Sequence, residues 1–359
     1  MQFFNNSAFN NHEQVSFFYD QATGLKAIIA IHNTNLGPAL GGCRMWDYSN
    51  DEEALYDVLR LAQGMTYKAA LAGLPLGGGK SVIIGNPKTM KSAALMQSMG
   101  KAVESLGGRY IIAEDVGTSV EDMNHISETC NHVTGCFKNN TGSGDPSPVT
   151  AYGVFVGIKS AAQYRLQREE LRSLKIAVQG LGHVGFHLCE LLHNEGVKLF
   201  VTDVDQEKIE AAVQKFGVTP VELEKIYDVD ADIFSPCALG AVINDQTITR
   251  LKVKIVAGAS NNQLAEVRHG KILAERGILY APDYAINVGG LISVYYEYAS
   301  RHHGIEFSRE SVFAHTNKLK ATLENIFSYA EQHKISTAAA ADIIAENLFS
   351  KPADVEKRN

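Results

Sequence analysis

The fold is decided by the stretch KIAVQGLGHVGFHLCELLHNEGVKLFVTD, residues 175–203. Lys175–Gln179 has the composition of a buried strand, residues 186–193 have the apolar spacing of a helix, and Lys198–Thr202 has the composition of a second strand. A GxGxxG motif stands between the first strand and the helix, and an acid follows the second strand, 23 residues after Gly180. This order predicts a β-α-β unit of the doubly wound, dinucleotide-binding type.

The motif assigns a role to each of its parts. The diphosphate of a dinucleotide would lie at the amino terminus of the helix, against the backbone of Gly180, Gly182, His183, Val184 and Gly185. Asp203 would bind the ribose hydroxyls, and its carboxylate would repel a 2′-phosphate, which favours NAD over NADP. Loops after later predicted strands at residues 233–235, 254–257 and 278–280 would line the same crevice, with Cys237 and Ala238 in the first of them.

A second informative stretch is GMTYKAALAGLPLGGGK, residues 64–80. It places Lys68 and Lys80 around a glycine triplet in an otherwise apolar segment. We expect the triplet to form a tight turn whose N–H groups approach an anion, so that two ammonium groups and bare amides could hold a small carboxylate. Lys68 extends the apolar stripe of a helix expected to begin at Ser49. The competing interpretation is a buried turn with both lysines reaching solvent.

A carboxylate follows the strand expected at residues 109–113, RYIIA. Asp115 stands just beyond the carboxyl end of that strand, where open α/β sheets place their reacting groups. Its alternative role is to cap the helix expected from Val120.

Composition and length set the outer limits. A chain of 359 residues is long for one core and suggests two domains, with a linker at KNNTGSGDPSP, residues 138–148. The net charge of −7 argues against nucleic acid and anionic membranes as partners. Five scattered cysteines indicate neither a disulfide framework nor a metal site. A polar amino terminus and the lack of a long apolar run predict a soluble, cytoplasmic protein.

Six motifs together resemble those of the glutamate, leucine, phenylalanine and valine dehydrogenases, in the branch that acts on apolar amino acids. They are GPALGGCRM (37–45), residues 64–80 above, AEDVGT (113–118), QGLGHVG (179–185), GASNNQL (258–264) and APDYAINVGGLI (281–292). The resemblance implies an α/β catalytic and oligomerisation domain over residues 1–140, a Rossmann domain over 141–329, and carboxyl-terminal helices from about residue 330 that return to the first domain. It also implies a homo-oligomer, commonly an octamer.

The resemblance further implies roles for individual residues. Lys68, with the backbone of Gly41 and Gly42, would hold the substrate α-carboxylate. Lys80 would activate water, and Asp115 would carry a proton to and from the amino group. The expected reaction is the NAD-dependent oxidative deamination of an L-α-amino acid to a 2-keto acid and ammonia, faster at alkaline pH.

Two residues would connect substrate and cofactor by the same resemblance: Asn262 would orient the substrate near the nicotinamide, and Thr150 would contact the carboxamide. Glutamate dehydrogenases carry a lysine at the position of Leu40 and a serine at that of Val294. Because both polar anchors are aliphatic here, glutamate is excluded. The expected pocket for a branched-chain side chain is lined by Leu40, Met65, Ala113, Leu291 and Val294.

Three alternatives stay open at this point. The substrate could be phenylalanine or tryptophan, with the same mechanism. The chain could be a non-catalytic NAD-binding regulator that has kept the fold, or a tetrahydrofolate-type dehydrogenase on a related scaffold.

Overall fold

A computed structural model describes residues 3–136 and 145–350. It divides the chain into two compact units, the first formed by residues 1–144, 294–307 and 345–359, and the second by residues 145–293 and 308–344. This division differs from the expected one, because residues 294–307 belong to the first unit and residues 330–344 to the second. Residues 138–144 of the expected linker lie outside the described residues.

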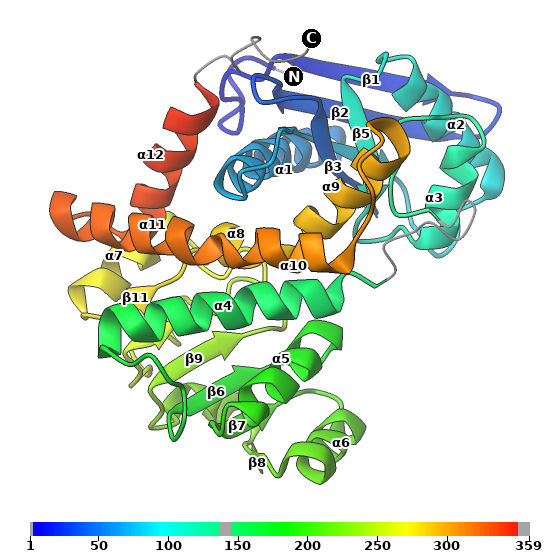
Figure 1. The fold of residues 1–359 in the computed structure, drawn as a ribbon. Helices are drawn as coiled ribbons and strands as arrows, with labels where there is room; N and C mark the ends of the chain where they lie inside the picture. Colours follow the sequence, from blue (N-terminus) through cyan, green and yellow to red (C-terminus); the bar gives the residue numbers. More distant parts are fainter. Residues whose placement is uncertain (1–2, 137–144, 351–359) are drawn as a thin grey trace. The chain divides into compact units, whose positions relative to one another are not determined.

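The first unit is built on a five-stranded sheet in the order β1-β2-β4-β3-β5. The β1–β2 and β2–β4 pairs are antiparallel, whereas β3 pairs in parallel with both β4 and β5. Its elements are β1 Gln14–Asp20, β2 Leu25–Asn33, β3 Ala39–Trp46, α1 Asp51–Leu71, β4 Gly77–Ile84, α2 Ala93–Glu104, β5 Tyr110–Glu114 and α3 Val120–Ser127 (Figure 1).

Alternating residues of β2 explain how this sheet is covered. Ile29 and Ile31 pack in one cluster with α2 and α3, whereas Ile28 and Ala30 pack in another with α1. A strand that is buried on both faces reads as a continuous apolar run, as β2 does. The sheet is therefore held between α1 on one face and the α2–α3 pair on the other.

The second unit contains a six-stranded parallel sheet in the order β11-β10-β9-β6-β7-β8. Its elements are α4 Ser147–Leu166, β6 Lys175–Gln179, α5 His183–Asn194, β7 Lys198–Thr202, α6 Gln206–Phe216, β8 Thr219–Pro220, the 3-10 helix η2 Leu223–Asp228, β9 Ile233–Pro236, β10 Ile255–Val256, α7 Val267–Glu275, β11 Leu279–Tyr280, α8 Asp283–Ile286, α10 Arg309–Asn317 and α11 Leu319–His333. The expected doubly wound sheet is confirmed, and β6 and β7 have the predicted bounds.

Two helices contain the points where the chain passes from one unit to the other. α9 Gly289–His302 changes unit after Ser293, and α12 Thr337–Phe349 changes unit after Ile344. The end of α12 packs in the first unit, where Glu346 accepts a hydrogen bond from the Tyr67 hydroxyl (2.7 Å) and Phe349 contacts the Tyr67 ring. The last turns of α12 therefore belong to the first unit. No helix within the described residues is long and apolar enough to cross a membrane.

Candidate active site

The absence of a side chain at Gly42 allows two charged residues to meet across a strand. β3 lies between β4, which carries Lys80, and β5, which is followed by Asp115. A Cβ atom on Gly42 would lie 2.7 Å from the Asp115 Cβ and 3.2 Å from the Lys80 Nζ. With glycine there, the Lys80 Nζ reaches the Asp115 Oδ2 at 2.9 Å. The predicted pair of Lys80 and Asp115 is thus brought together beside Gly42.

A third charged residue, Arg44, completes this group. Its Nε lies 3.0 Å from the same Asp115 Oδ2. Burial opposes ionisation of Asp115, but Lys80 and Arg44 outweigh it, so the pKa of Asp115 lies below its ordinary value. Sequence reasoning missed Arg44. The sequence did not identify residues 39–46 as a strand; once β3 is known, the place of Arg44 two residues after Gly42 puts both on the same face of the sheet.

The loop after β5 holds the Asp115 backbone in place. The Asp115 N–H donates to the Thr118 Oγ1 (2.9 Å), and that hydroxyl lies 2.9 Å from the Cys43 carbonyl oxygen of β3. Gly117 has φ of +82°, and a Cβ there would lie 2.0 Å from the Met45 carbonyl oxygen. The competing role of Asp115 as a helix cap is not what the structure has, because Ser119 caps α3.

The glycine triplet does not form the expected turn. Gly77, Gly78 and Gly79 are the extended first residues of β4. They are glycines because other chain segments come very close: a Cβ on Gly78 would lie 2.0 Å from the Thr66 backbone nitrogen of α1, and a Cβ on Gly77 would lie 2.0 Å from the Asn33 carbonyl oxygen. The triplet therefore lets α1 and β2 pack against β4, and the expectation that its own N–H groups turn toward an anion was wrong.

α1 extends to Leu71, so Lys68 lies within this helix and is half-buried. Met65, also half-buried, is almost one turn earlier on the same side. The helix begins one residue later than expected, because Asn50 rather than Ser49 caps it by accepting from the Glu53 N–H (2.9 Å).

Two of the aliphatic residues expected around the substrate lie on neighbouring strands. Leu40 on β3 and Ala113 on β5 are both buried, and Gly42 pairs with Ala113 in the sheet register. Val294 is half-buried on the part of α9 that belongs to the first unit. Gly41 is also required to be glycine, because a Cβ there would lie 1.7 Å from the Gly79 carbonyl oxygen.

In the second unit the three motif glycines have different surroundings. Gly180 has φ of +100°, and a Cβ on Gly185 would lie 2.0 Å from the Gly180 carbonyl oxygen, which brings α5 close to β6. Gly182 faces open space, with no atom within 4 Å of its ideal Cβ. Gly182 is the residue before α5, whose first N–H groups are those of His183 and Val184, and no side chain caps this end of the helix. This arrangement fits a diphosphate.

Asp203 lies at the end of β7 with its carboxylate turned to the glycine loop. Its Oδ2 accepts from the Leu181 N–H (2.5 Å) and its Oδ1 from the Asp205 N–H (2.9 Å). Cys237 and Ala238 also lie beside this loop: a Cβ on Gly180 would lie 2.8 Å from the Ala238 nitrogen, and one on Gly185 would lie 3.4 Å from the Cys237 Cβ. The structure thus places Asp203, Cys237 and Ala238 beside the glycine loop.

Three further predicted residues belong to the second unit. Thr150 is in the first turn of α4, where its Oγ1 bonds the Pro146 carbonyl oxygen (3.0 Å). Asn262 has φ of +52°, and its N–H donates to the Asp283 Oδ2 (2.6 Å). A non-glycine residue in this region is strained and is held there by its surroundings. Leu291 is buried in the first turn of α9.

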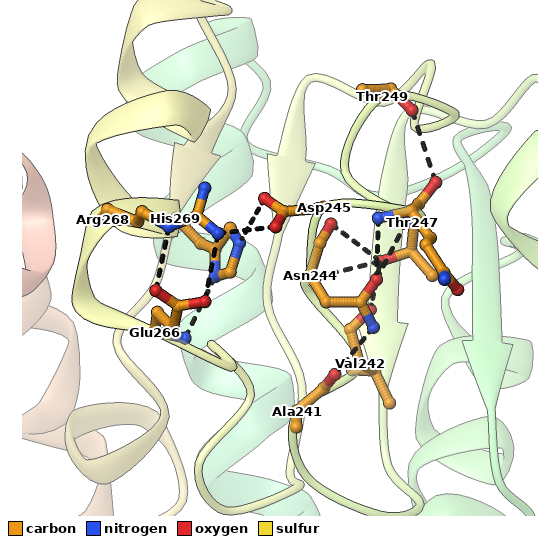
Figure 2. Close-up of polar contacts among 10 residues, drawn as sticks. Ala241, Val242, Asn244, Asp245, Thr247, Thr249, Glu266, Arg268 and His269 are labelled. Atoms are coloured by element: carbon orange, nitrogen blue, oxygen red, sulfur yellow. Dashed lines mark hydrogen bonds and ion pairs between the residues drawn. The ribbon is translucent and has the colours of Figure 1, made fainter.

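Asp245, Glu266 and His269 offer ligand atoms within 4.8 Å of one another, which raises the question of a metal (Figure 2). The His269 Nδ1 accepts from the Glu266 N–H (3.0 Å), so its Nε2 carries the hydrogen and donates to the Asp245 Oδ1 (3.1 Å). Arg268 binds both carboxylates. Because both ring nitrogens are used and an arginine neutralises the acids, the group is better explained as a cap of α7.

Comparisons with known proteins agree with this geometry. Residues 11–132 match the model of the Glu/Leu/Phe/Val dehydrogenase dimerisation domain, and residues 201–351 match that of the glutamate/leucine/phenylalanine/valine dehydrogenases. A leucine dehydrogenase from Thermoactinomyces intermedius is 52% identical over 94% of this chain and 90% of its own. An L-tryptophan dehydrogenase from Nostoc punctiforme is 48% identical over 94% of both chains. The crystal structure of L-tryptophan dehydrogenase from that organism superimposes with a TM-score of 0.84 and 45% identity, covering 95% of this chain and 96% of that one.

Proposed function

The chain belongs to the glutamate/leucine/phenylalanine/valine dehydrogenase family of amino-acid dehydrogenases, and on that premise we propose that it oxidatively deaminates branched-chain aliphatic L-amino acids, leucine foremost, with NAD. The products are the 2-keto acid and ammonia, and the reaction is reversible. The observation that carries the proposal is the contact of Lys80 with Asp115 across Gly42. This contact places a base, Lys80, and a proton carrier, Asp115, next to each other on the sheet.

A dinucleotide held by the glycine loop and Asp203 would supply the hydride acceptor for the substrate Cα, and the residues of the chain move the protons. Asp115 takes a proton from the substrate amino group. Lys80 takes a proton from the water that adds to the iminium carbon. Asp115 then returns its proton to the nitrogen, and the hydroxyl of the adduct releases its proton to solvent as the C=O bond forms and ammonia leaves. Lys68 holds the α-carboxylate together with the backbone of Gly41 and Gly42. Because Lys80 can act as a base only when its amine is uncharged, deamination is expected to be faster at alkaline pH.

The choice of NAD is supported by Asp203. The family uses NAD or NADP, and a carboxylate fixed beside the glycine loop by the Leu181 and Asp205 N–H groups favours ribose hydroxyls over a 2′-phosphate.

The choice of an apolar substrate is supported by Leu40 and Ala113. Both are buried, and neither offers a charge to a glutamate side chain. Desolvating an unpaired carboxylate there would cost several kcal/mol. The similarity to an L-tryptophan dehydrogenase favours an aromatic amino acid as the second candidate substrate.

The proposal is tested by following NADH formation with NAD and a panel of leucine, isoleucine, valine, phenylalanine, tryptophan and glutamate. We expect turnover of the first three and little of glutamate. Lys80→Met and Asp115→Asn should each lower kcat by about 10²–10⁴-fold. Lys91→Met is the matched control, because it removes another partly buried ion pair of the same unit, with Asp122 at 2.8 Å. Lack of turnover with every amino acid would refute the function.

Two further predictions accompany the function. Assembly as a homo-oligomer, an octamer by family resemblance, is supported by the match of residues 11–132 to a dimerisation domain, and light scattering of the purified protein would test it. A cytoplasmic location remains a prediction from the sequence, to be tested by fractionation.

A further inference from the structure

Asp115 is bound asymmetrically by its two cations. Within the described residues, its ion pairs with the Lys80 Nζ (2.9 Å) and the Arg44 Nε (3.0 Å) both end on Oδ2. An oxygen that already accepts two charge-assisted hydrogen bonds is a poor acceptor for a further proton. The other oxygen, Oδ1, takes part in neither ion pair.

Arg44 is itself fixed from its opposite side. Its Nη1 lies 2.9 Å from the Asp57 Oδ2, and that oxygen also accepts from the Tyr48 hydroxyl at 2.8 Å. The other oxygen of Asp57 binds the Arg60 Nη2 at 2.6 Å. The Arg44 guanidinium is thus a bridge between two carboxylates, with its side chain 19% exposed.

The bridge links three elements that carry the proposed site. Arg44 is on β3, Asp57 is on α1, and Asp115 follows β5. Lys68 is on the same helix as Asp57, three turns further on. A guanidinium can hold two carboxylates at once in a fixed plane, whereas a lysine ammonium is a point charge on a flexible stem. The planar shape of the arginine side chain, and not only its charge, therefore matters at this position.

We propose that Arg44 is a positioning residue for proton transfer: with Lys80 it holds the Asp115 Oδ2, so that Oδ1 exchanges the proton with the substrate amino group. This rests on the proposed function. The proton passes from the amino nitrogen to Oδ1 and back to the departing ammonia, and Arg44 neither gains nor loses one. Asp57 and Tyr48 keep the guanidinium in the orientation that this requires.

The charge of Arg44 has a second effect on the same group. The ionisable residues that act on Asp115 come from each neighbouring segment: Lys80 of β4, Arg44 and Cys43 of β3, Tyr48 after β3 and Tyr110 of β5. Among these only Lys80 and Arg44 are cations, and both lower the pKa of Asp115. Removing Arg44 should therefore make Asp115 easier to protonate.

Two variants of Arg44 separate position from charge. In Arg44→Gln the most acidic limb of the pH profile of kcat/KM should move to higher pH, because one of the two cations that lower the pKa of Asp115 is lost. Its kcat should fall by about 10–100-fold through misplacement of Asp115, with a solvent isotope effect larger than that of the parent. Arg44→Lys keeps the charge, so its acidic limb should stay in place while kcat still falls.

The controls distinguish this inference from a loss of stability and from failure of the function. Lys91→Met breaks a comparable ion pair away from Asp115 and should leave the acidic limb and the isotope effect unchanged. If Arg44→Gln does not fold, Arg44→Lys and Asp57→Asn replace it, and both should lose kcat without a shifted limb. Arg44 variants that behave like Lys91→Met, in a protein whose parent is active, would overturn the inference alone. An inactive parent would instead refute the proposed function.

Discussion

Replacing Gly42 by alanine perturbs the proposed site by a single methyl group. The added Cβ would lie 2.7 Å from the Asp115 Cβ and from the Glu114 carbonyl oxygen, and 3.2 Å from the Lys80 Nζ. Ordinary contact begins near 3.4 Å, so β3 and the segment after β5 must separate by roughly 0.7 Å. Since Glu114 contributes backbone, rotation of a side chain cannot relieve the overlap.

Gly42→Ala should lower both the stability, because the added methyl group overpacks the sheet, and the rate, because it displaces Lys80 and Asp115. Inserting a methyl group into a packed region typically costs about 1–3 kcal/mol of unfolding free energy. A displacement approaching 1 Å at reacting groups costs about 10²-fold in rate, or roughly 2.7 kcal/mol of transition-state stabilisation. We therefore expect Gly42→Ala to fold with a lowered midpoint of urea unfolding and to lose about a hundredfold in kcat/KM.

The assay compares NADH formation and urea unfolding for Gly42→Ala and for Gly64→Ala. Gly64 is an exposed glycine inside α1 with no atom within 4 Å of its ideal Cβ. Alanine there should stabilise the helix by about 0.5–1 kcal/mol and leave kcat/KM unchanged. Full activity of Gly42→Ala would show that Lys80 and Asp115 need not meet beside Gly42, and would refute the reasoning.

Three other predictions concern substrate, cofactor and pH. Leu40→Lys should create measurable turnover of glutamate and weaken that of leucine, because the ammonium gives a side-chain carboxylate a partner; a substrate panel that ranks both amino acids as before would contradict it. Asp203→Asn should raise the ratio of kcat/KM with NADP to that with NAD by about tenfold or more, through loss of like-charge repulsion, and an unchanged ratio would exclude Asp203 from this choice. Burial, helped by His12, lowers the pKa of His32 to about 4 from 6.5, so between these values the unfolded chain binds more protons and stability falls as pH decreases. In His32→Gln the urea unfolding midpoint should depend less on pH across that range than in the parent. If the midpoints of both proteins changed with pH in parallel, His32 would not be the cause.

Local patterns predicted the second unit well. The strands on either side of the glycine loop have the bounds that the apolar runs 175–179 and 198–202 indicate. The roles of Gly180 and Gly185 also follow from the motif, since both depend on neighbours within the same β-α-β unit. Such elements are predictable because the residues that explain them are close in sequence.

The first unit was predicted less well because the residues that require its glycines are far from them in the sequence. Gly78 is glycine on account of Thr66 in another element, and nothing within the triplet itself distinguishes a strand from a turn. Arg44 was missed for the same reason, since its two carboxylate partners come from α1 and from the segment after β5. β1, the edge strand beside β2 in the described sheet, was missed because its half-exposed residues give a weak apolar pattern.

α9 has a consequence for how substrate preference can change. Leu291 and Val294, both expected to contact the substrate side chain, belong to different compact units but are three residues apart on this one helix. Helical geometry alone fixes their separation, at a rise of about 4.5 Å and on neighbouring positions of one face. Their spacing is therefore independent of how the two units are placed. The two positions can therefore be varied together at a fixed spacing. A library of variants confined to Leu291 and Val294 should change which substrate side chain is preferred, while the proton-transfer residues Lys80 and Asp115 stay unchanged.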